Sequence, residues 1–116
     1  MTKTRWARVL VVESSAGQAG VLVDGISRDQ RLAAAGVALS ASEAVSLCER
    51  LKPDVITVDL MLPDETGLDV ILRILRKQYV PMIVVGAPAL DGASNLGFRA
   101  LLAGAADIVP KPRDAS

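Results

Sequence analysis

The sequence predicts an α/β protein, a doubly wound three-layer sandwich in which helices cover both faces of a parallel sheet. Three observations carry this prediction. Short apolar runs alternate with helix-length segments along the chain. The runs are mostly β-branched and do not alternate with polar residues, which is typical of strands buried on both faces. The alternation of strand and helix continues through five strands, as it does when crossover helices connect parallel strands.

The predicted strands are short and closely spaced. They cover residues 9–12, 37–39, 55–58, 82–85 and 107–109. The run at 37–39 is the weakest of the five. Polar or turn-forming residues follow four of the runs directly, namely Glu13, Asp59, Gly86 and Pro110.

Helix signals fill the segments between the strands. The pairs Ser40/Glu43 and Thr66/Asp69 have the spacing of a capping box, so each predicts a helix start. Pro53 ends the first of these two helices. The other two predicted helices are residues 18–31, weakened by Gly20 and Gly25, and residues 94–103, which Gly104 ends.

No helix is predicted after the last strand, because residues 111–116 are short and polar. We therefore expect a fold that lacks its final helix, with part of one sheet face bare. Monomers rarely leave a contiguous apolar surface of a few hundred Å² open. We expect a homodimer, by symmetric contact or helix exchange, to cover it.

Composition excludes several classes of function. The 116 residues suit one domain, and 13 basic against 13 acidic residues leave no charge that favours nucleic acid or a membrane surface. The absence of His removes Ser-His-Asp triads and His-metal sites, and a single Cys excludes a disulfide framework. Pro81, Gly86 and Pro88 interrupt the longest uncharged run, so no membrane span is predicted and we expect a cytoplasmic protein.

Polar side chains gather where the strands end. Ligands of doubly wound sheets bind at the carboxyl ends of the strands, which places Glu13, Ser14, Asp59 and Lys111 at one edge. A carboxylate after a central buried strand is costly unless it is used, and Asp59 is such a residue. The structural alternative is that Asp59 caps the next turn.

Three segments of the sequence, which include Asp59 and Lys111, are informative when they are taken together. Residues 54–63, Asp-Val-Ile-Thr-Val-Asp-Leu-Met-Leu-Pro, precede Gly67-Leu68, and residues 81–85 and 104–112 continue the match. Together they resemble the receiver domains of two-component response regulators. The ending Ala-Asp-Ile-Val-Pro-Lys-Pro is most similar to the receiver of chemotaxis protein-glutamate methylesterases. The resemblance covers the chain from about residue 8 to residue 112.

The resemblance implies a strand order of 2-1-3-4-5 and a role for several residues. Asp59 matches the aspartate that accepts a phosphoryl group from a histidine kinase. Lys111 matches the lysine that pairs with the phosphoryl oxygens, and its peptide bond to Pro112 is commonly cis in the family. Mg²⁺ is the implied cofactor, with Glu13, Asp59 and the backbone carbonyl of Met61 as its ligands.

The sequence departs from the family pattern at the same edge. Ser14 stands where receivers carry a second acidic residue, so one metal-binding carboxylate is missing. The switch positions hold Gly86, Ala87 and Ile108, where a hydroxyl residue and an aromatic residue are usual. We therefore expect weak Mg²⁺ binding and slow phosphorylation of Asp59.

Three functions remain open on the sequence. The first is a phosphoaccepting receiver that regulates a partner or a methylesterase effector. The second is a degenerate receiver that acts as a protein-interaction module. The third, nucleotide binding, rests only on the glycines in Gly17-Gln18-Ala19-Gly20. The chain contains no catalytic effector domain, although a full-length relative would be a protein-glutamate methylesterase. Cys48 is expected to be a small buried side chain without a reactive thiol.

Overall fold

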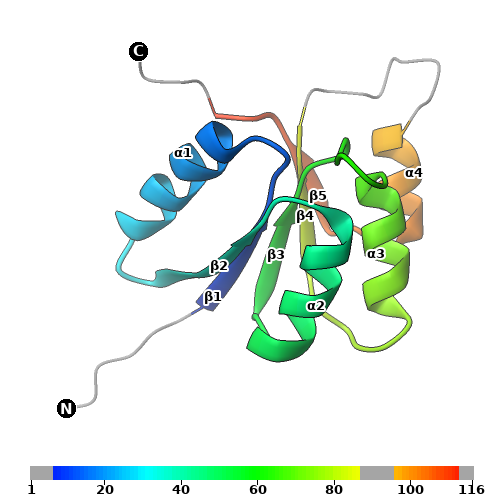
Figure 1. Cartoon of the computed structure of the whole chain (residues 1–116), viewed down its shortest axis with the longest axis horizontal. Coiled ribbons are helices and arrows are strands. Elements are labelled where there is room, and N and C mark those ends of the chain that lie inside the picture. Colours follow the sequence, from blue (N-terminus) through cyan, green and yellow to red (C-terminus); the bar gives the residue numbers. More distant parts are fainter. Residues whose placement is uncertain (1–6, 87–95, 113–116) are drawn as a thin grey trace.

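The computed structural model describes residues 7–86 and 96–112 of the chain (Figure 1). Its strands form one parallel sheet in the order β2-β1-β3-β4-β5, which confirms the predicted order. The strands are β1 (Ala7–Val12), β2 (Leu32–Ala38), β3 (Val55–Val58), β4 (Met82–Val85) and β5 (Asp107–Val109). The described helices are α1 (Ala16–Ser27), α2 (Ala41–Leu51), α3 (Gly67–Leu75) and α4 (Leu96–Ala103).

The helices form two outer layers around the sheet. Figure 1 shows α1 on one face of the sheet and α2, α3 and α4 on the other. The larger apolar core lies between the sheet and these three helices and includes the fully buried Leu10, Ile56, Ile71 and Met82. A smaller cluster of Val9, Val11 and Ala19 lies under α1. The doubly wound sandwich predicted from the unalternated runs is therefore confirmed.

The first two strands differ from their predicted bounds. β1 starts at Ala7 rather than at residue 9, and β2 covers Leu32–Ala38 rather than 37–39. Most of β2 is alanine and glycine, which have low strand propensity, so its sequence hides a strand that pairing with β1 creates. The register shifts between Val9 and Leu10, next to Gly36 on β2. A Cβ at Gly36 would approach Leu51 Cδ1 to 2.9 Å, so a larger residue beside this bulge would require the end of the Leu51 side chain to shift.

The capping and glycine signals predicted for α2, α3 and α4 are found, although the capping box of α2 is incomplete. Thr66 and Asp69 form the full capping box of α3. Ser40 accepts a hydrogen bond from the Glu43 amide, but the Glu43 carboxylate accepts from the Leu39 amide instead of that of Ser40. α4 ends before Gly104, which has a φ of 125° that favours glycine.

Three other expectations concern the start of the last helix, the first helix and membrane crossing. The predicted start of the last helix, at Ser94, lies outside the described residues. α1 covers Ala16–Ser27 rather than the predicted residues 18–31, because Ser15 caps its start and the helix ends at Arg28; it forms although it contains Gly20 and Gly25. None of the helices in residues 7–86 and 96–112 has the length and hydropathy needed to cross a bilayer.

Candidate functional site

Two buried carboxylates lie side by side at the carboxyl edge of the sheet. Glu13 directly follows β1, Asp59 directly follows β3, and Lys111 lies shortly after β5. Because β1 and β3 are neighbouring parallel strands, the residues after them reach the same point. Glu13 is 1% exposed and Asp59 is 5% exposed. Carboxylates at this depth need partners, so their surroundings decide their chemistry.

Lys111 binds both carboxylates. Its Nζ donates to Glu13 Oε2 at 3.1 Å and to Asp59 Oδ2 at 3.2 Å. Burial alone would lower the pKa of Lys111, but the hydrogen bonds to the two carboxylates outweigh it and raise the pKa. Lys111 therefore keeps its positive charge, and the sequence prediction that it meets Asp59 is correct in geometry.

Asp59 is the most extensively hydrogen-bonded group of the site. Ser14 Oγ donates to Asp59 Oδ2 at 3.0 Å, and the Met61 amide donates to Oδ1 at 3.3 Å. Burial would raise the pKa of Asp59, but the hydrogen bonds from its neighbours, Glu13 and Lys111 among them, lower the pKa. The hydrogen bonds therefore favour the ionised form of Asp59.

Glu13 has the opposite balance. Oε2 accepts from the Ser15 amide at 3.2 Å and from Lys111, while Oε1 is buried without a hydrogen-bond partner among the described residues. Burial raises the pKa of Glu13, and the adjacent Asp59 raises it further. The orphaned Oε1 is an acceptor that a cation or a donor must satisfy.

The residues present fit Mg²⁺ in part. Met61 pairs with Thr66 in an antiparallel bridge whose hydrogen bonds run between Leu62 and Glu65 and between Gly67 and Leu60, so the described backbone leaves the Met61 carbonyl without a donor. This carbonyl, Asp59 and the orphaned oxygen of Glu13 supply the oxygen ligands that Mg²⁺ prefers. Within the described ranges no cluster of three or more His, Cys, Asp or Glu side chains could hold a metal. The donor set therefore has two carboxylates, with Ser14 bound to Asp59 as a neutral third group.

The switch positions are described only in part. A Cβ at Gly86 would lie 4.0 Å from Asp59 Oδ1, so the residue at the end of β4 does border the carboxylate. Glycine there offers no hydroxyl. Ile108 is half-buried and packs against the larger core. Ala87 lies outside the described residues.

Three further features predicted from the sequence can be compared with the structure, and the peptide bond before Pro112 differs from the expectation. No cis peptide bond occurs among the described residues, so the bond between Lys111 and Pro112 is trans, the isomer that X-Pro bonds favour by about 0.5–1 kcal/mol. Gly17 and Gly20 lie inside α1 and form no phosphate-binding loop. Cys48 is 1% exposed and burial raises the pKa of its thiol, in line with a structural role.

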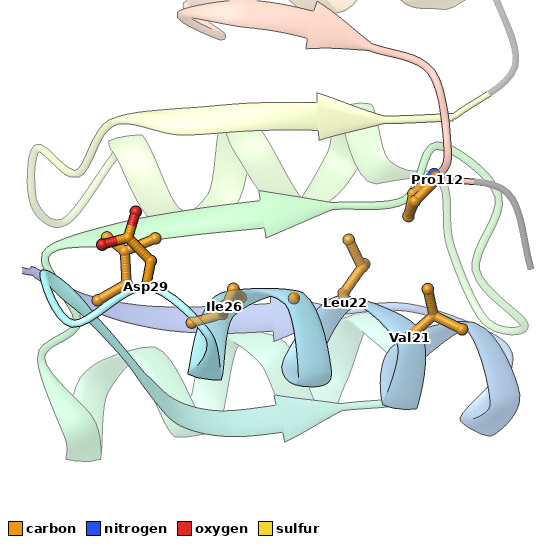
Figure 2. A pocket seen from close by; sticks show the side chains of 7 residues that line it. Val21, Leu22, Ile26, Asp29 and Pro112 are labelled. Carbon is orange, nitrogen blue, oxygen red and sulfur yellow. The ribbon is translucent and has the colours of Figure 1, made fainter. Parts of the chain in front are cut away.

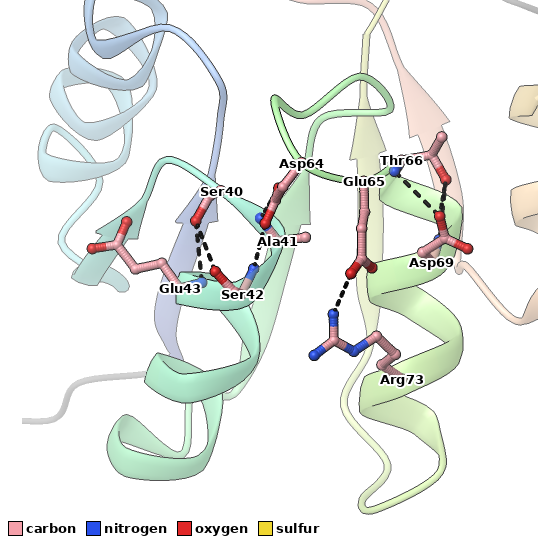
Figure 3. Close-up of polar contacts among 9 residues, drawn as sticks. All are labelled: Ser40, Ala41, Ser42, Glu43, Asp64, Glu65, Thr66, Asp69 and Arg73. Atoms are coloured by element: carbon pink, nitrogen blue, oxygen red, sulfur yellow. Dashed lines mark hydrogen bonds and ion pairs between the residues drawn. The ribbon is translucent and has the colours of Figure 1, made fainter.

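Sequence reasoning missed the contacts that hold the loop after Asp59. The carboxylate of Asp64 accepts hydrogen bonds from the amides of Ala41 at 2.8 Å and Ser42 at 3.1 Å (Figure 3). Glu65 pairs with Arg73 at 2.7 Å. Gly67 packs so closely that a Cβ there would lie 2.3 Å from the Asp59 carbonyl oxygen. An Asp directly after Pro63 is a loop signal, but its partner on a distant helix has no local signature.

The fold and the buried Asp–Glu–Lys cluster define a class of protein. The family model of the response regulator receiver domain matches residues 9–116, so the chain belongs to this family of signal-transduction domains. Receiver domains bind Mg²⁺ for phosphorylation and work with a histidine kinase and an effector.

Individual proteins and structures show which receivers this chain is similar to. The chain is 40% identical, over 93% of its length, to the protein-glutamate methylesterase/protein-glutamine glutaminase of Pyrococcus abyssi, of which it spans 29%. The receiver crystal structure of Thermotoga maritima CheB matches with a TM-score of 0.85 and 36% identity, covering 97% of this chain and 83% of that one. A Burkholderia pseudomallei response regulator with a phosphorylated aspartic acid and a calcium ion matches with a TM-score of 0.75 and 27% identity, over 92% of this chain and 61% of that one.

Proposed function

We propose that this receiver accepts a phosphoryl group on Asp59 from the phosphohistidine of a histidine kinase. The observation that carries the proposal is the position of Lys111, whose ammonium lies within hydrogen-bond distance of Asp59 and Glu13 together. The lowered pKa of Asp59 supports it, because the nucleophile must be a carboxylate. The phosphorylated aspartic acid of the Burkholderia relative is a precedent in the same fold.

The chain's own groups would share the work of the transfer. One oxygen of Asp59 attacks the phosphorus, the P–N bond to the donor imidazole breaks, and its electron pair returns to the ring nitrogen. Lys111 pairs with the phosphoryl oxygens, and the Met61 amide holds Asp59 in orientation. Mg²⁺, when bound by Glu13, Asp59 and the Met61 carbonyl, neutralises charge on the moving phosphoryl group.

The effector proposed for this receiver is a methylesterase. The curated relatives are protein-glutamate methylesterases, and this chain spans 29% of the Pyrococcus abyssi protein. We place phosphorylation of Asp59 upstream of such an activity, carried on the same polypeptide or on a partner protein. A cytoplasmic location suits both the kinase and this effector.

A degenerate receiver is the second candidate, and two observations favour it. Ser14 replaces a carboxylate and donates to Asp59, which occupies an oxygen that the phosphoryl chemistry needs. Gly86 borders Asp59 without a hydroxyl to contact a phosphoryl group. In this form the domain would bind its partner without efficient phosphorylation.

Intact-mass spectrometry after incubation with acetyl phosphate and Mg²⁺ separates the two candidates. The phosphoaccepting receiver gains the mass of one phosphoryl group, slowly, and the Asp59→Asn variant gains none. The degenerate receiver stays unmodified at any incubation time. The control is Asp54→Asn, which removes an aspartate at the opposite, amino end of β3.

We also propose that a second copy of the chain covers the face beside α1. A groove of about 310 Å³ opens there, lined by Val21, Leu22, Gly25, Ile26, Asp29, Leu32 and Pro112 (Figure 2). Of the described helices, α1 alone lies on this face, and apart from Asp29 the lining is uncharged. A self-complementary apolar contact between two copies would remove this surface from water.

A further inference from the structure

The loop between β3 and α3 carries two of the proposed Mg²⁺ ligands, Asp59 and the Met61 carbonyl. The side chain of Met61 is 65% exposed, so its own packing does not fix the position of the carbonyl. Leu62 packs against the core and sets the depth of the loop. The bridge between Met61 and Thr66 joins the two sides of the loop to each other, and further polar contacts lie at its tip, residues 64–66.

Two of these polar contacts are local. Glu65 pairs with Arg73, and Thr66 caps α3 through Asp69 (Figure 3). Both partners, Arg73 and Asp69, belong to α3, the helix that the loop leads into. These two contacts hold the loop against α3, which follows it in the chain. They do not connect the loop to the segment between β2 and α2.

Asp64 makes the long-range contact. Its carboxylate accepts from the amides of Ala41 and Ser42, the first two residues of α2, while Ser40 accepts from Glu43. The first three amides of α2 are thus satisfied, two of them by a residue of another segment. Hydrogen bonds from backbone amides also lower the pKa of Asp64, which keeps it charged. The charge suits the positive end of the helix dipole.

From this arrangement we propose that Asp64 is a positioning residue for Mg²⁺, one that ties the Asp59–Met61 loop to the start of α2 and so holds the Met61 carbonyl in place. The inference rests on the proposed phosphoacceptor function, because it takes Met61 as a metal ligand. Groups that support metal ligands typically change metal affinity about 10–100-fold when they are removed. Linkage also requires the reciprocal effect: Mg²⁺ must stabilise the amides of Ala41 and Ser42.

The test measures Mg²⁺ affinity without any phosphodonor, by following backbone amide NMR shifts of the whole chain during titration with MgCl₂. Asp64→Ala is expected to weaken Mg²⁺ binding roughly ten-fold, the low end for a supporting group. Asp64→Asn, which keeps an acceptor oxygen, is expected to lose less. In the wild type, Mg²⁺ is expected to slow hydrogen exchange at Ala41 and Ser42.

Two controls separate positioning from stability and charge. Ser40→Ala removes another capping bond of the same α2 start and lowers the melting temperature, but it leaves the loop tied to α2. Glu65→Gln removes the same charge from the neighbouring position. Both controls are expected to bind Mg²⁺ like the wild type.

Specific outcomes overturn the inference. Equal Mg²⁺ affinity in Asp64→Ala and wild type, or equal losses in Asp64→Ala and Ser40→Ala, would show that Asp64 only stabilises the fold. If the alanine variant does not fold, the comparison of Asp64→Asn with Glu65→Gln decides in the same way. Failure of phosphorylation in a protein whose Mg²⁺ affinity depends on Asp64 would contradict the proposed function alone.

Discussion

At the scale of single residues, Ser14 is the position that bears most on how strongly the proposed site would attract a divalent cation. It donates a neutral hydrogen bond to Asp59 where a third carboxylate would bind the metal. Asp59 is thereby oriented, but the attraction for a divalent cation is reduced. Oε1 of Glu13 has no hydrogen-bond partner among the described residues, so this oxygen is available to a cation or a donor.

The first prediction is that Ser14→Asp tightens Mg²⁺ binding and speeds phosphorylation of Asp59. The added carboxylate supplies an anionic ligand, and the metal-free protein is expected to lose stability because a third anion crowds Asp59 and Glu13. Calorimetric titration with MgCl₂ and unfolding in urea with and without Mg²⁺ measure the two effects. Ser46→Asp serves as the control, since it adds the same charge at an exposed position of α2 that makes no contact with Asp64. Unchanged Mg²⁺ affinity in Ser14→Asp would mean that residue 14 does not face the metal.

The second prediction concerns the pH dependence that Glu13 creates. Its pKa is raised above the ordinary value of 4.5, chiefly by burial. Above that value the folded protein holds a proton that the unfolded chain has released, so stability falls as pH rises through the raised pKa. Asp59, with a lowered pKa, acts in the opposite direction as pH falls below 3.8. Glu13→Gln is therefore expected to reduce the fall in the free energy of unfolding above pH 4.5. The loss of stability at acid pH, which Asp59 causes, is expected to remain.

Urea unfolding at a series of pH values measures this effect. Glu49→Gln is the matched control, because Glu49 is exposed, its pKa is lowered by Lys77, and its removal leaves the decline above pH 4.5 unchanged. A Glu13→Gln variant with the same pH profile as the wild type would show that Glu13 titrates normally and that its environment is not as described.

At the scale of elements, strands rich in β-branched residues are easier to predict from the sequence than β2. β3, β4 and β5 have the predicted bounds because short runs rich in Val and Ile mark them. β2 was mostly missed, since Ala and Gly carry no strand signal and its pairing with β1 supplies the structure. The starts of α2 and α3 could be predicted because a capping residue is a signal in the local sequence.

The site shows the same division between local and long-range information. Topology alone predicted that Glu13, Asp59 and Lys111 would meet, because residues after parallel strands share an edge. The direction of each pKa and the contact between Asp64 and α2 depend on burial and on distant backbone amides, which no local pattern encodes.

The third prediction tests how closely α3 packs on the acceptor strand. Gly67→Ala would place a Cβ against the backbone of Asp59, which cannot move without displacing the carboxylate. We expect a loss of at least about 1–3 kcal/mol, the usual cost of overpacking. Gly20→Ala is the control: nothing lies within 4 Å of that Cβ, and α1 is expected to gain about 0.5–1 kcal/mol. Thermal unfolding compares the two, and equal effects would contradict the close approach at Gly67.

At the scale of the whole molecule, the two faces of the sheet are unequal. Three helices cover one face over the larger core, and α1 alone is described on the other (Figure 1). The groove beside α1 is the consequence, and the proposed second copy is its occupant.

The fourth prediction follows from that groove. Val21→Glu places a charge in the apolar lining and is expected to shift the protein to a monomer in light scattering at high concentration. Leu102→Glu is the control, because Leu102 is 73% exposed on α4 and lies outside the groove. A wild type that is monomeric at all concentrations would rule out the second copy as occupant.

The central claim is that Asp59, and not Glu13, receives the phosphoryl group. Borohydride reduces an acyl phosphate to an alcohol, so treatment after acetyl phosphate and Mg²⁺ converts a phosphorylated aspartate to homoserine in place. Peptide sequencing by tandem mass spectrometry then locates the reduced residue. The account predicts homoserine at position 59 in the wild type and no reduced residue in Asp59→Asn. Reduction at Glu13, or at no residue of the wild type after prolonged incubation, would contradict it.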